Sequence, residues 1–406
     1  MISQKEYAKR RKKIGINLPN NSAVLLFSAE LKQRSFDTEY KFRQNSHFYY
    51  LTGCTEDKSA ILLLKQNNQL KTYLFVEPKN KELELWHGKR VGVKKAKKRF
   101  LVDDIFSNKK LKYMLKDLEI DYLYGDIKDS RLQKYKKKFQ LNDILNSIRL
   151  LRLIKSKSEI KLIKKALKIT QEAHHFVMDM QKQGKYEYEI EAELEYRFLK
   201  NGAYSNAYSS IVAGGNRANT LHYIKNDKKL KNKQLLLIDA GAEYQYYASD
   251  ITRTIPIGKI SREQKEIYTL VLKTQEKIIS MIKPGVLRSQ LQKKSVKLLT
   301  QGLIELGILK GNLQKLIKKE KYKKYYPHGI GHYMGLDVHD DVLYKDSNGN
   351  EIPLAKGMVI TIEPGIYINK EDKIVPKQYR GIGVRIEDNI LVTKKGYKNL
   401  SKKIKK

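Results

Sequence analysis

The sequence has a single cysteine, Cys54, among its 406 residues. It can therefore form no intramolecular disulfide and no zinc cluster built on cysteine ligands. Long apolar runs are also missing: the stretch at 23–27 is far shorter than the roughly 20 apolar residues of a membrane span. The basic N-terminus leads into no apolar segment of the signal-peptide type. These absences predict a cytoplasmic protein with no membrane partner.

Acidic residues are scarce relative to basic ones, with 44 Asp and Glu against 82 Lys and Arg, so the formal net charge is +38. Such a charge attracts polyanions. The basic residues are mostly lysines, however, and they are spread along the whole chain instead of forming one block. This distribution favours a solvated lysine-rich surface over a nucleic-acid groove. Nucleic acid is therefore not the partner that the sequence predicts.

The chain length favours two domains, at about 100–200 residues each, and hydrophobic residues make up 41%, enough for a sizeable core. Over 1–150, short apolar runs alternate with polar stretches of helical character, which is typical of an α/β domain. Ser156 and Glu159 then have the spacing of a helix capping box. A boundary is therefore predicted near 150, with a second, α+β domain over 151–406.

The second domain repeats a unit of helices followed by strands. Helices are expected at 157–182, 187–200 and 289–308, and another should begin after Ser261 and end before Pro284. Strands are expected at 208–213, 234–241, 248–257, 331–338, 358–368 and 382–393. Two successive helix-then-hairpin halves indicate an internal pseudo-twofold with a site between the halves. The basic tail at 394–406 is expected to be frayed.

Two of the predicted hairpins each carry a pair of carboxylates. A simple turn at 244–245 would set Asp239 opposite Asp250, and the later hairpin would set Glu363 opposite Glu387. Opposed like charges destabilise a sheet, and a buried carboxylate pair needs either a shared proton or a cation. The repetition of this pattern in two hairpins indicates a shared chemical purpose.

Three histidines, His328, His332 and His339, lie in a glycine-rich stretch between the two carboxylate pairs. Four carboxylates and one histidine form a ligand set for two divalent cations. Hard oxygen ligands with a single imidazole favour Mn²⁺, Co²⁺, Fe²⁺ or Zn²⁺ over copper. Two such cations, about 3.5–4 Å apart, can hold a bridging hydroxide and polarise a carbonyl group. The sequence therefore predicts a metal-dependent hydrolase.

The chain resembles the pita-bread metallopeptidases, which include methionine aminopeptidase, prolidase and aminopeptidase P, and within them it is most similar to aminopeptidase P. In the second domain the matching motifs are YSSIVAGGNRANTLHY, LLLIDAGAEY, SDITRT, HGIGHYMGLDVHD, TIEPGIY and GIGVRIEDN. In the first domain they are FDTEYKFRQNSHFYYLTG and LWHGKRVG. The resemblance implies an N-terminal α/β domain, a pseudo-symmetric catalytic domain with a curved antiparallel sheet, and a dimer or tetramer.

The same resemblance implies cleavage of Xaa-Pro peptides and a role for each matching residue. The implied ligands of two divalent cations, Mn²⁺ foremost, are Asp239, Asp250, His332, Glu363 and Glu387. Glu363 would also act as general base or acid. His222 and His339 would line the substrate site, and His328 would lie nearby, either supporting the site or binding substrate. Arg385 and Tyr367 would lie beside the metals. Asp37, Trp86 and Arg152 match positions at the outer rim, although Trp86, the only tryptophan, could equally be core packing.

Two rival functions remain open from the sequence. Prolidases share all five ligands but cut only Xaa-Pro dipeptides, so room beyond the proline would separate them from an aminopeptidase. A non-catalytic protein of the same fold, binding protein or nucleic acid, is kept open by the net charge of +38. The five filled ligand positions count against this second rival.

Overall fold

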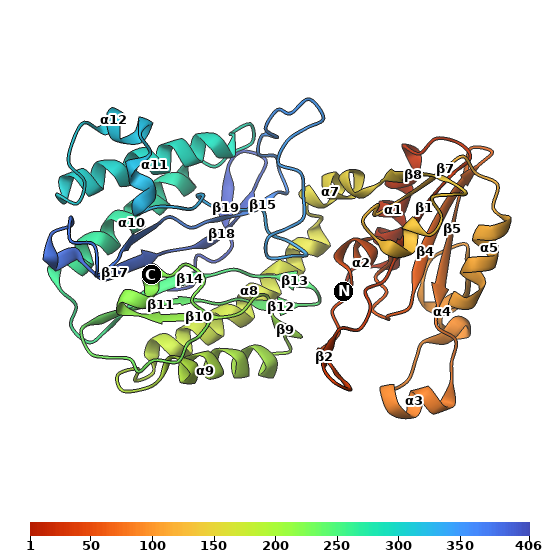
Figure 1. Ribbon diagram of the computed structural model, residues 1–406, viewed down its shortest axis with the longest axis horizontal. Coiled ribbons are helices and arrows are strands. Elements are labelled where there is room, and N and C mark those ends of the chain that lie inside the picture. Colours follow the sequence, from red (N-terminus) through yellow and green to blue (C-terminus); the bar gives the residue numbers. More distant parts are fainter. The chain divides into compact units, whose positions relative to one another are not determined.

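The computed structural model describes residues 1–406, which form two compact units, Met1–Arg152 and Leu153–Lys406 (Figure 1). None of the helices combines the length and the apolar character that a membrane span requires.

Unit 1 is built on a six-stranded mixed sheet in the order β6-β5-β4-β1-β7-β8, in which β1 pairs antiparallel with β4 and parallel with β7. The strands are β1 (Ser22–Phe27), β4 (Ala60–Gln66), β5 (Gln69–Val76), β6 (Asp104–Ser107), β7 (Tyr122–Gly125) and β8 (Gln140–Asp143). A separate hairpin consists of β2 (Gln33–Ser35) and β3 (Thr38–Glu39). The helices are α1 (Gln4–Ile16), α2 (Ser46–Thr52), α3 (Lys81–His87), α4 (Gly92–Arg99), α5 (Leu111–Asp117), α6 (Ser130–Gln133) and α7 (Leu145–Leu153). This mixture of elements is the α/β architecture predicted for the N-terminal region.

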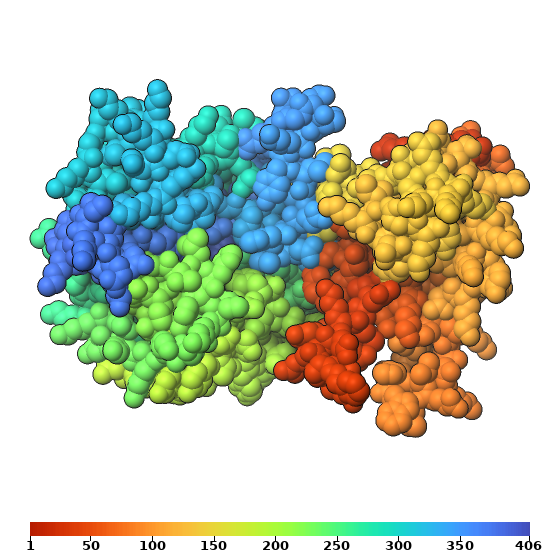
Figure 2. Space-filling model, viewed as in Figure 1, coloured from red at the N-terminus to blue at the C-terminus, as the bar shows by residue number.

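Unit 2 places short antiparallel sheets between two pairs of helices. Its first half comprises α8 (Lys157–Asp179), α9 (Glu187–Lys200), β9 (Ser205–Asn206), β10 (Ile211–Gly214), β11 (Gln234–Asp239), β12 (Ala242–Tyr244), β13 (Tyr247–Ala248) and β14 (Thr252–Ile257). Its second half comprises α10 (Arg262–Ser280), α11 (Arg288–Glu305), α12 (Leu313–Lys318), β15 (Val359–Ile362), β16 (Gly365–Ile368), β17 (Ile382–Arg385), β18 (Asp388–Val392) and β19 (Tyr397–Asn399). Figure 1 shows α8 and α9 on one side of the strands and α10 and α11 on the other. On the face shown in Figure 2, the cyan and blue segments of the second half lie beside the green segments of the first.

The long helices begin where capping residues predict and bury one apolar face. The side chain of Ser156 accepts from the Glu159 amide, and the Glu159 carboxylate accepts from the Ser156 amide, which confirms the predicted capping box. The helix α9 has the predicted bounds. In α8, Ile169, Ala173 and Val177 recur every four residues and are buried against the first-half strands. Helix packing therefore holds the strands that carry the carboxylates.

The first hairpin has a different register from the predicted one. Asp239 pairs with Thr252, two positions away from the predicted partner Asp250. The turn residues are Gln245 and Tyr246, and both have positive φ, as a two-residue type I′ turn requires. The turn lies one residue later than predicted, so every pairing moves by two. The prediction missed it because neither Gln nor Tyr is a residue type typical of such a turn. Asp250 therefore lies on the irregular link between β13 and β14.

The second hairpin has the predicted register. Ile362 pairs with Asp388 in one short ladder, and Gly365 pairs with Arg385 in the next. Glu363 and Glu387 lie opposite one another in the interruption between the two ladders. Their side chains are thus freed from the regular alternation of a continuous strand.

Two further predictions are wrong. Residues 331–338 form no strand, only an isolated bridge between Tyr333 and Ile360. The chain there passes so close to β15 that a Cβ atom on Gly331 would lie 2.0 Å from the Thr361 carbonyl oxygen. The C-terminal tail is also not frayed: β19 pairs with β18, and Ile404 is buried.

The tail is held by a buried ion pair behind the strands. The Arg253 guanidinium lies 2.8 Å from an Asp388 oxygen, and both side chains are almost fully buried. The same guanidinium donates to the carbonyl oxygens of Ile404 and Lys405. Burial opposes ionisation of Asp388, but the charges of Arg253 and Lys406, together with the hydrogen bonds from Lys406 and Ser401, lower the pKa of Asp388 to about 2. The pair therefore stays charged throughout the neutral range.

We expect Asp388→Asn to destabilise unit 2, because the variant leaves the buried Arg253 charge without a counter-charge. Breaking one partner of a buried pair costs about 3–5 kcal/mol. The control Asp179→Asn removes an exposed pair with Lys405, 3.7 Å apart, and should cost less than about 1 kcal/mol. Urea denaturation of the metal-free protein, followed by far-ultraviolet circular dichroism, measures both. Equal losses in the two variants would contradict the structural importance of this pair.

Candidate metal centre

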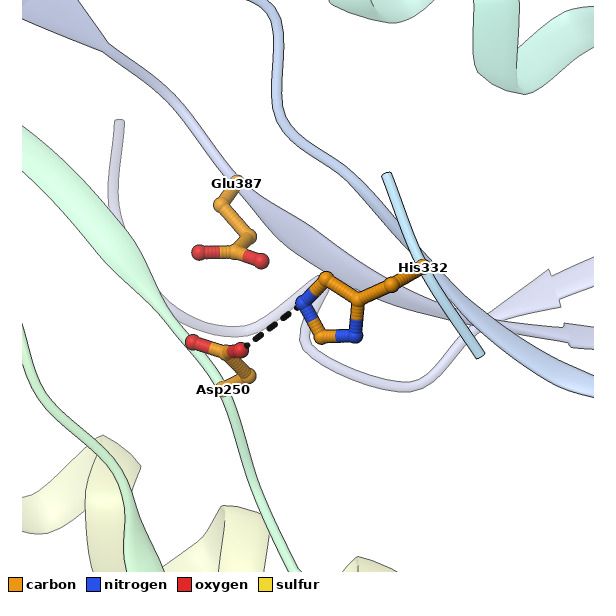
Figure 3. A group of neighbouring side chains, drawn as sticks. All are labelled: Asp250, His332 and Glu387. Atoms are coloured by element: carbon orange, nitrogen blue, oxygen red, sulfur yellow. Dashed lines mark ion pairs between the residues drawn. The ribbon is translucent and has the colours of Figure 1, made fainter. Parts of the chain in front are cut away.

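The five residues that the sequence predicts as metal ligands line one cavity of unit 2, of about 610 Å³. The same cavity is lined by four further predicted residues: His222, His328, His339 and Arg385. Asp250, His332 and Glu387 each offer a ligand atom, and these atoms lie within 4.8 Å of one another (Figure 3). The two hairpins and the glycine-rich segment thus converge on one site.

Asp239 and Asp250 are joined by a tyrosine that the sequence analysis does not single out. The Tyr208 hydroxyl lies 2.6 Å from one oxygen of each carboxylate. Burial, and then the charges of the two aspartates, raise the pKa of Tyr208 well above its usual value. Tyr208 therefore keeps its proton and holds the two carboxylates side by side. It lies in the motif YSSIVAGG, but no local spacing connects it with partners 31 and 42 residues away.

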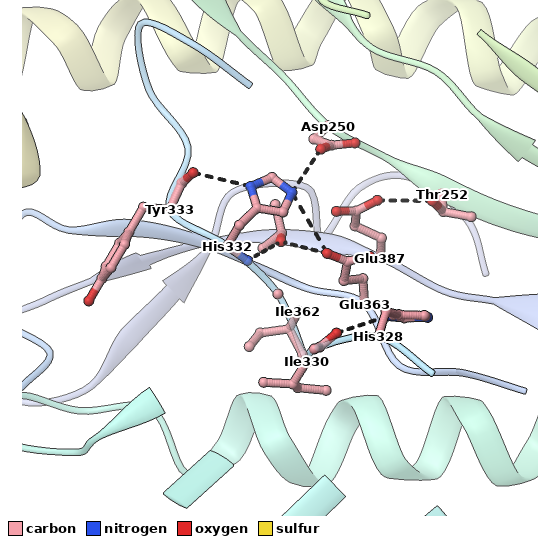
Figure 4. Close-up of polar contacts among 12 residues, drawn as sticks. Asp250, Thr252, His328, Ile330, His332, Tyr333, Ile362, Glu363 and Glu387 are labelled. Atoms are coloured by element: carbon pink, nitrogen blue, oxygen red, sulfur yellow. Dashed lines mark hydrogen bonds and ion pairs between the residues drawn. The ribbon is translucent and has the colours of Figure 1, made fainter. Parts of the chain in front are cut away.

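His332 is oriented for metal binding through one nitrogen. Its Nδ1 lies 3.1 Å from the Tyr333 carbonyl oxygen, so Nδ1 carries a proton and donates. Its Nε2 lies 3.2 Å from an Asp250 oxygen and 3.7 Å from a Glu363 oxygen (Figure 4). Such a backbone hydrogen bond at the second nitrogen is the usual support of a ligating histidine.

The glutamates are placed differently from one another. One oxygen of Glu387 accepts from the Thr252 hydroxyl at 2.9 Å, whereas the other, Oε1, is buried without a hydrogen-bond partner. Burial, and then the charges of Asp250, Glu363 and Asp239, raise the pKa of Glu387 well above its usual value. Burial likewise raises the pKa of Glu363 to about 7, although the charges of His332 and Arg385 oppose the shift.

These features fit a divalent cation. A cation would give the buried, unpartnered Glu387 oxygen a ligand bond and would offset the repulsion between the crowded carboxylates. It could also bind the histidine nitrogen that points toward them. The residues that would hold it are the five predicted ligands.

Arg385 begins a chain of hydrogen bonds along one wall of the site. Its guanidinium contacts Asp239 at 2.6 Å and donates to the Tyr367 hydroxyl at 3.0 Å. Tyr367 in turn lies 2.8 Å from Nε2 of His328, whose Nδ1 faces the Gly329 carbonyl oxygen. Nδ1 must donate to that carbonyl, so Nε2 accepts from Tyr367. Both ring nitrogens of His328 are therefore engaged, which suits an orienting role better than direct substrate contact.

The three predicted rim residues lie in unit 1. Asp37 is exposed between β2 and β3, and Trp86 on α3 is 80% exposed. The alternative that Trp86 is core packing is therefore wrong. Arg152 is buried, with a guanidinium nitrogen 3.2 Å from Nδ1 of His47. A rim role for these residues stays a prediction.

Metal binding should release protons from this site. Burial lowers the pKa of His332, but the hydrogen bond and charge of Asp250, together with the charge of Glu363 and the Tyr333 carbonyl, raise it to about 9, and burial raises the pKa of Glu363 to about 7. Both groups must lose their protons to bind a cation, so Mn²⁺ affinity should rise with pH up to about 9. Calorimetric titration of metal-free protein with Mn²⁺ at pH 7, in buffers of different ionisation enthalpy, counts the protons. A heat that is independent of the buffer would contradict the prediction.

Comparison with known proteins agrees with this geometry. Residues 161–394 match the family model of metallopeptidase family M24, and residues 7–122 match that of the aminopeptidase P N-terminal domain. The Xaa-Pro aminopeptidase of Haemophilus influenzae is 42% identical, and the alignment covers 100% of this chain and 96% of that protein. The Xaa-Pro aminopeptidase of Escherichia coli is 36% identical over the same shares.

Solved structures are similar over the whole chain. Aminopeptidase P from Escherichia coli, with the inhibitor Pro-Leu, has a TM-score of 0.94 and 34% identity, covering 100% of this chain and 96% of that one. Aminopeptidase PepP of Pseudomonas aeruginosa has a TM-score of 0.95 and 37% identity over the same shares. Together with the matches over 7–122 and 161–394, these similarities show that the chain belongs to metallopeptidase family M24, with an aminopeptidase P N-terminal domain ahead of its catalytic domain.

Proposed function

We propose that this protein is a metal-dependent aminopeptidase that hydrolyses the bond between an N-terminal residue and a proline in second position. The observation that carries the proposal is the convergence of four carboxylates and His332 on one cavity. Relatives named Xaa-Pro aminopeptidase, up to 42% identical over the full chain, support the substrate class. The proposed ligands of two divalent cations are the five predicted residues, and Mn²⁺ is the proposed metal.

When bound, the cations would act as Lewis acids on the scissile carbonyl and lower the pKa of water to near neutrality. The residues of the chain supply the proton handling. The Glu363 carboxyl has a pKa of about 7 in the metal-free protein, so at neutral pH it can both accept and return a proton. It would take a proton from water at one oxygen and pass it to the departing proline nitrogen.

Two histidines would hold the substrate carbonyl. His222 and His339 both line the cavity, and the ring of His339 lies 4.2 Å from that of His332, centroid to centroid. Burial, and then the charge of His332, lower the pKa of His339, so that it is neutral at pH 7. A neutral imidazole still donates one hydrogen bond, which suits stabilisation of the oxygen that becomes negative in the transition state.

Selection for proline would come from shape. A prolyl nitrogen carries no N–H, and the ring fixes φ, so a site need offer no acceptor at that position. Leu221, Ile224 and Val338 supply apolar lining near the histidines. Ile224 is 57% exposed while lining the cavity, so the site is open to solvent on this side. This opening favours an aminopeptidase, which needs room beyond the proline, over a prolidase. The homo-oligomer and the cytoplasmic location stay predictions.

The substrate class is tested by peptide length. We expect metal-free protein to regain hydrolysis of an Xaa-Pro-Yaa tripeptide when Mn²⁺ is restored, and to lose it again with a chelator. The matching Xaa-Pro dipeptide should be a poor substrate. Product release followed by chromatography measures both. Cleavage of the dipeptide alone would identify a prolidase, and cleavage of neither would favour a non-catalytic protein.

The proton-handling role is tested at Glu363. Glu363→Gln cannot accept a proton, and loss of general acid–base catalysis costs about 10²–10⁴-fold in rate, so kcat should fall within that range. Glu371→Gln changes an exposed carboxylate, 74% accessible, and is a matched control that should keep its kcat. Metal content measured on each variant separates proton transfer from ligand loss. A kcat within threefold of the unmodified protein at full metal content would contradict the role.

A further inference from the structure

The wall of the cavity that carries His222 is an irregular segment between β10 and β11. We call residues 215–228 the His222 segment; it begins as a short 3-10 helix, Gly215–Asn219. Both His222 and Ile224 from this segment line the cavity, and both are exposed. No regular strand or α-helix fixes the position of these two side chains. Their placement must therefore come from contacts elsewhere along the segment.

One buried carboxylate contacts both ends of the segment. Glu187, at the start of α9, is fully buried. Its Oε1 accepts from the Gly214 amide at 2.8 Å and from Arg217 Nε at 2.6 Å. Its Oε2 accepts from the Tyr223 hydroxyl at 2.8 Å and from the Lys228 amide at 3.1 Å. All four partners are donors, so the site requires two acceptor oxygens.

Asn226 supplies a second attachment point. Its side chain is completely buried, and its φ is +46°. Its side-chain amide forms hydrogen bonds to the backbone at the edge of β10, as a neighbouring strand would. Its Oδ1 accepts from the Val212 amide at 3.0 Å, and its Nδ2 donates to the Ser210 carbonyl at 2.8 Å. Asparagine tolerates this left-handed conformation better than most residues. The chain from Thr220 to Ile224 is thus held between buried polar anchors.

We propose that Glu187 is a positioning residue that sets the place of His222 in the cavity. The proposal rests on the function proposed above and deepens it. Glu187 touches Tyr223, the residue directly after His222, and its other three contacts fix the beginning and the end of the segment. Loss of the carboxylate releases donors at both ends at once, so the loop between them moves as a unit.

Glu187→Gln tests the proposal, because it replaces one carboxylate oxygen by an NH₂ group. That group cannot accept hydrogen bonds, so two of the four contacts are lost. A misplacement of about 1 Å can cost about 10²-fold in rate, so kcat/KM for an Xaa-Pro-Yaa tripeptide should fall by up to about 100-fold. If Glu187 acts through His222, the double variant Glu187→Gln/His222→Ala should be no slower than His222→Ala alone. Metal content should stay unchanged, because Glu187 contacts none of the ligands.

Glu189→Gln is the matched control on the same helix, since Glu189 accepts from the Tyr186 amide and contacts none of the four groups that donate to Glu187. It should keep its activity. Losses that multiply in the double variant, or an unchanged Glu187→Gln, would overturn the proposal. If Glu187→Gln fails to fold, Tyr223→Phe, which removes one of the four contacts, replaces it in the same comparison of single and double variants with His222→Ala.

Hydrogen exchange gives a readout that does not depend on the reaction. Glu187→Gln should accelerate amide exchange over 215–228, and Glu189→Gln should not. If the unmodified protein cleaves no Xaa-Pro peptide, the proposed function fails, whereas unchanged exchange over 215–228 in Glu187→Gln overturns the positioning role by itself.

Discussion

The repulsion between four carboxylates in one cavity is the constraint on which the rest of unit 2 depends. Asp239, Asp250, Glu363 and Glu387 lie together with only Arg385 and His332 to balance their charge nearby. Neighbouring groups contact these carboxylates: the Tyr208 hydroxyl lies beside one oxygen of each aspartate, and the Thr252 hydroxyl donates to Glu387. One Glu387 oxygen is left without any partner. The protein thus stabilises the arrangement of the carboxylates and leaves this Glu387 oxygen for a cation.

The architecture supports this arrangement by interrupting its strands at the site. Asp250 lies on the link between β13 and β14, and Glu363 and Glu387 lie between two short ladders. A continuous strand would alternate its side chains between two faces and could not turn several of them toward one centre. Behind the site, the Arg253–Asp388 pair holds the strand that follows Glu387. Helices packed on both outer sides of the strands stabilise unit 2 and so compensate for the hydrogen bonds that these irregular links lack.

Much of this structure could be predicted from local patterns. Capping residues such as Ser156 located the helices, and the pairing of apolar strands gave the second hairpin its register. The choice of metal ligands could not be made from local patterns, because any one carboxylate in a strand could equally be a solvent-facing residue. The ordered motifs of a known family identified the ligands. The Gln245–Tyr246 turn was misplaced by one residue, because neither side chain belongs to the usual type I′ pairs.

Other features depend on contacts that no local pattern contains. Tyr208 reaches its two aspartates from far along the chain, and the strand predicted at 331–338 is replaced by a close crossing at Gly331. The basic tail at 394–406 was predicted to be frayed, yet Arg253 donates hydrogen bonds to two of its carbonyl oxygens.

Anomalous diffraction from crystals of the protein grown with Mn²⁺ tests the central claim most directly. The account predicts two anomalous peaks among the four carboxylates, about 3.5–4 Å apart, with His332 Nε2 bound to one of them. No peak in the cavity, or a peak only at surface carboxylates, would contradict it.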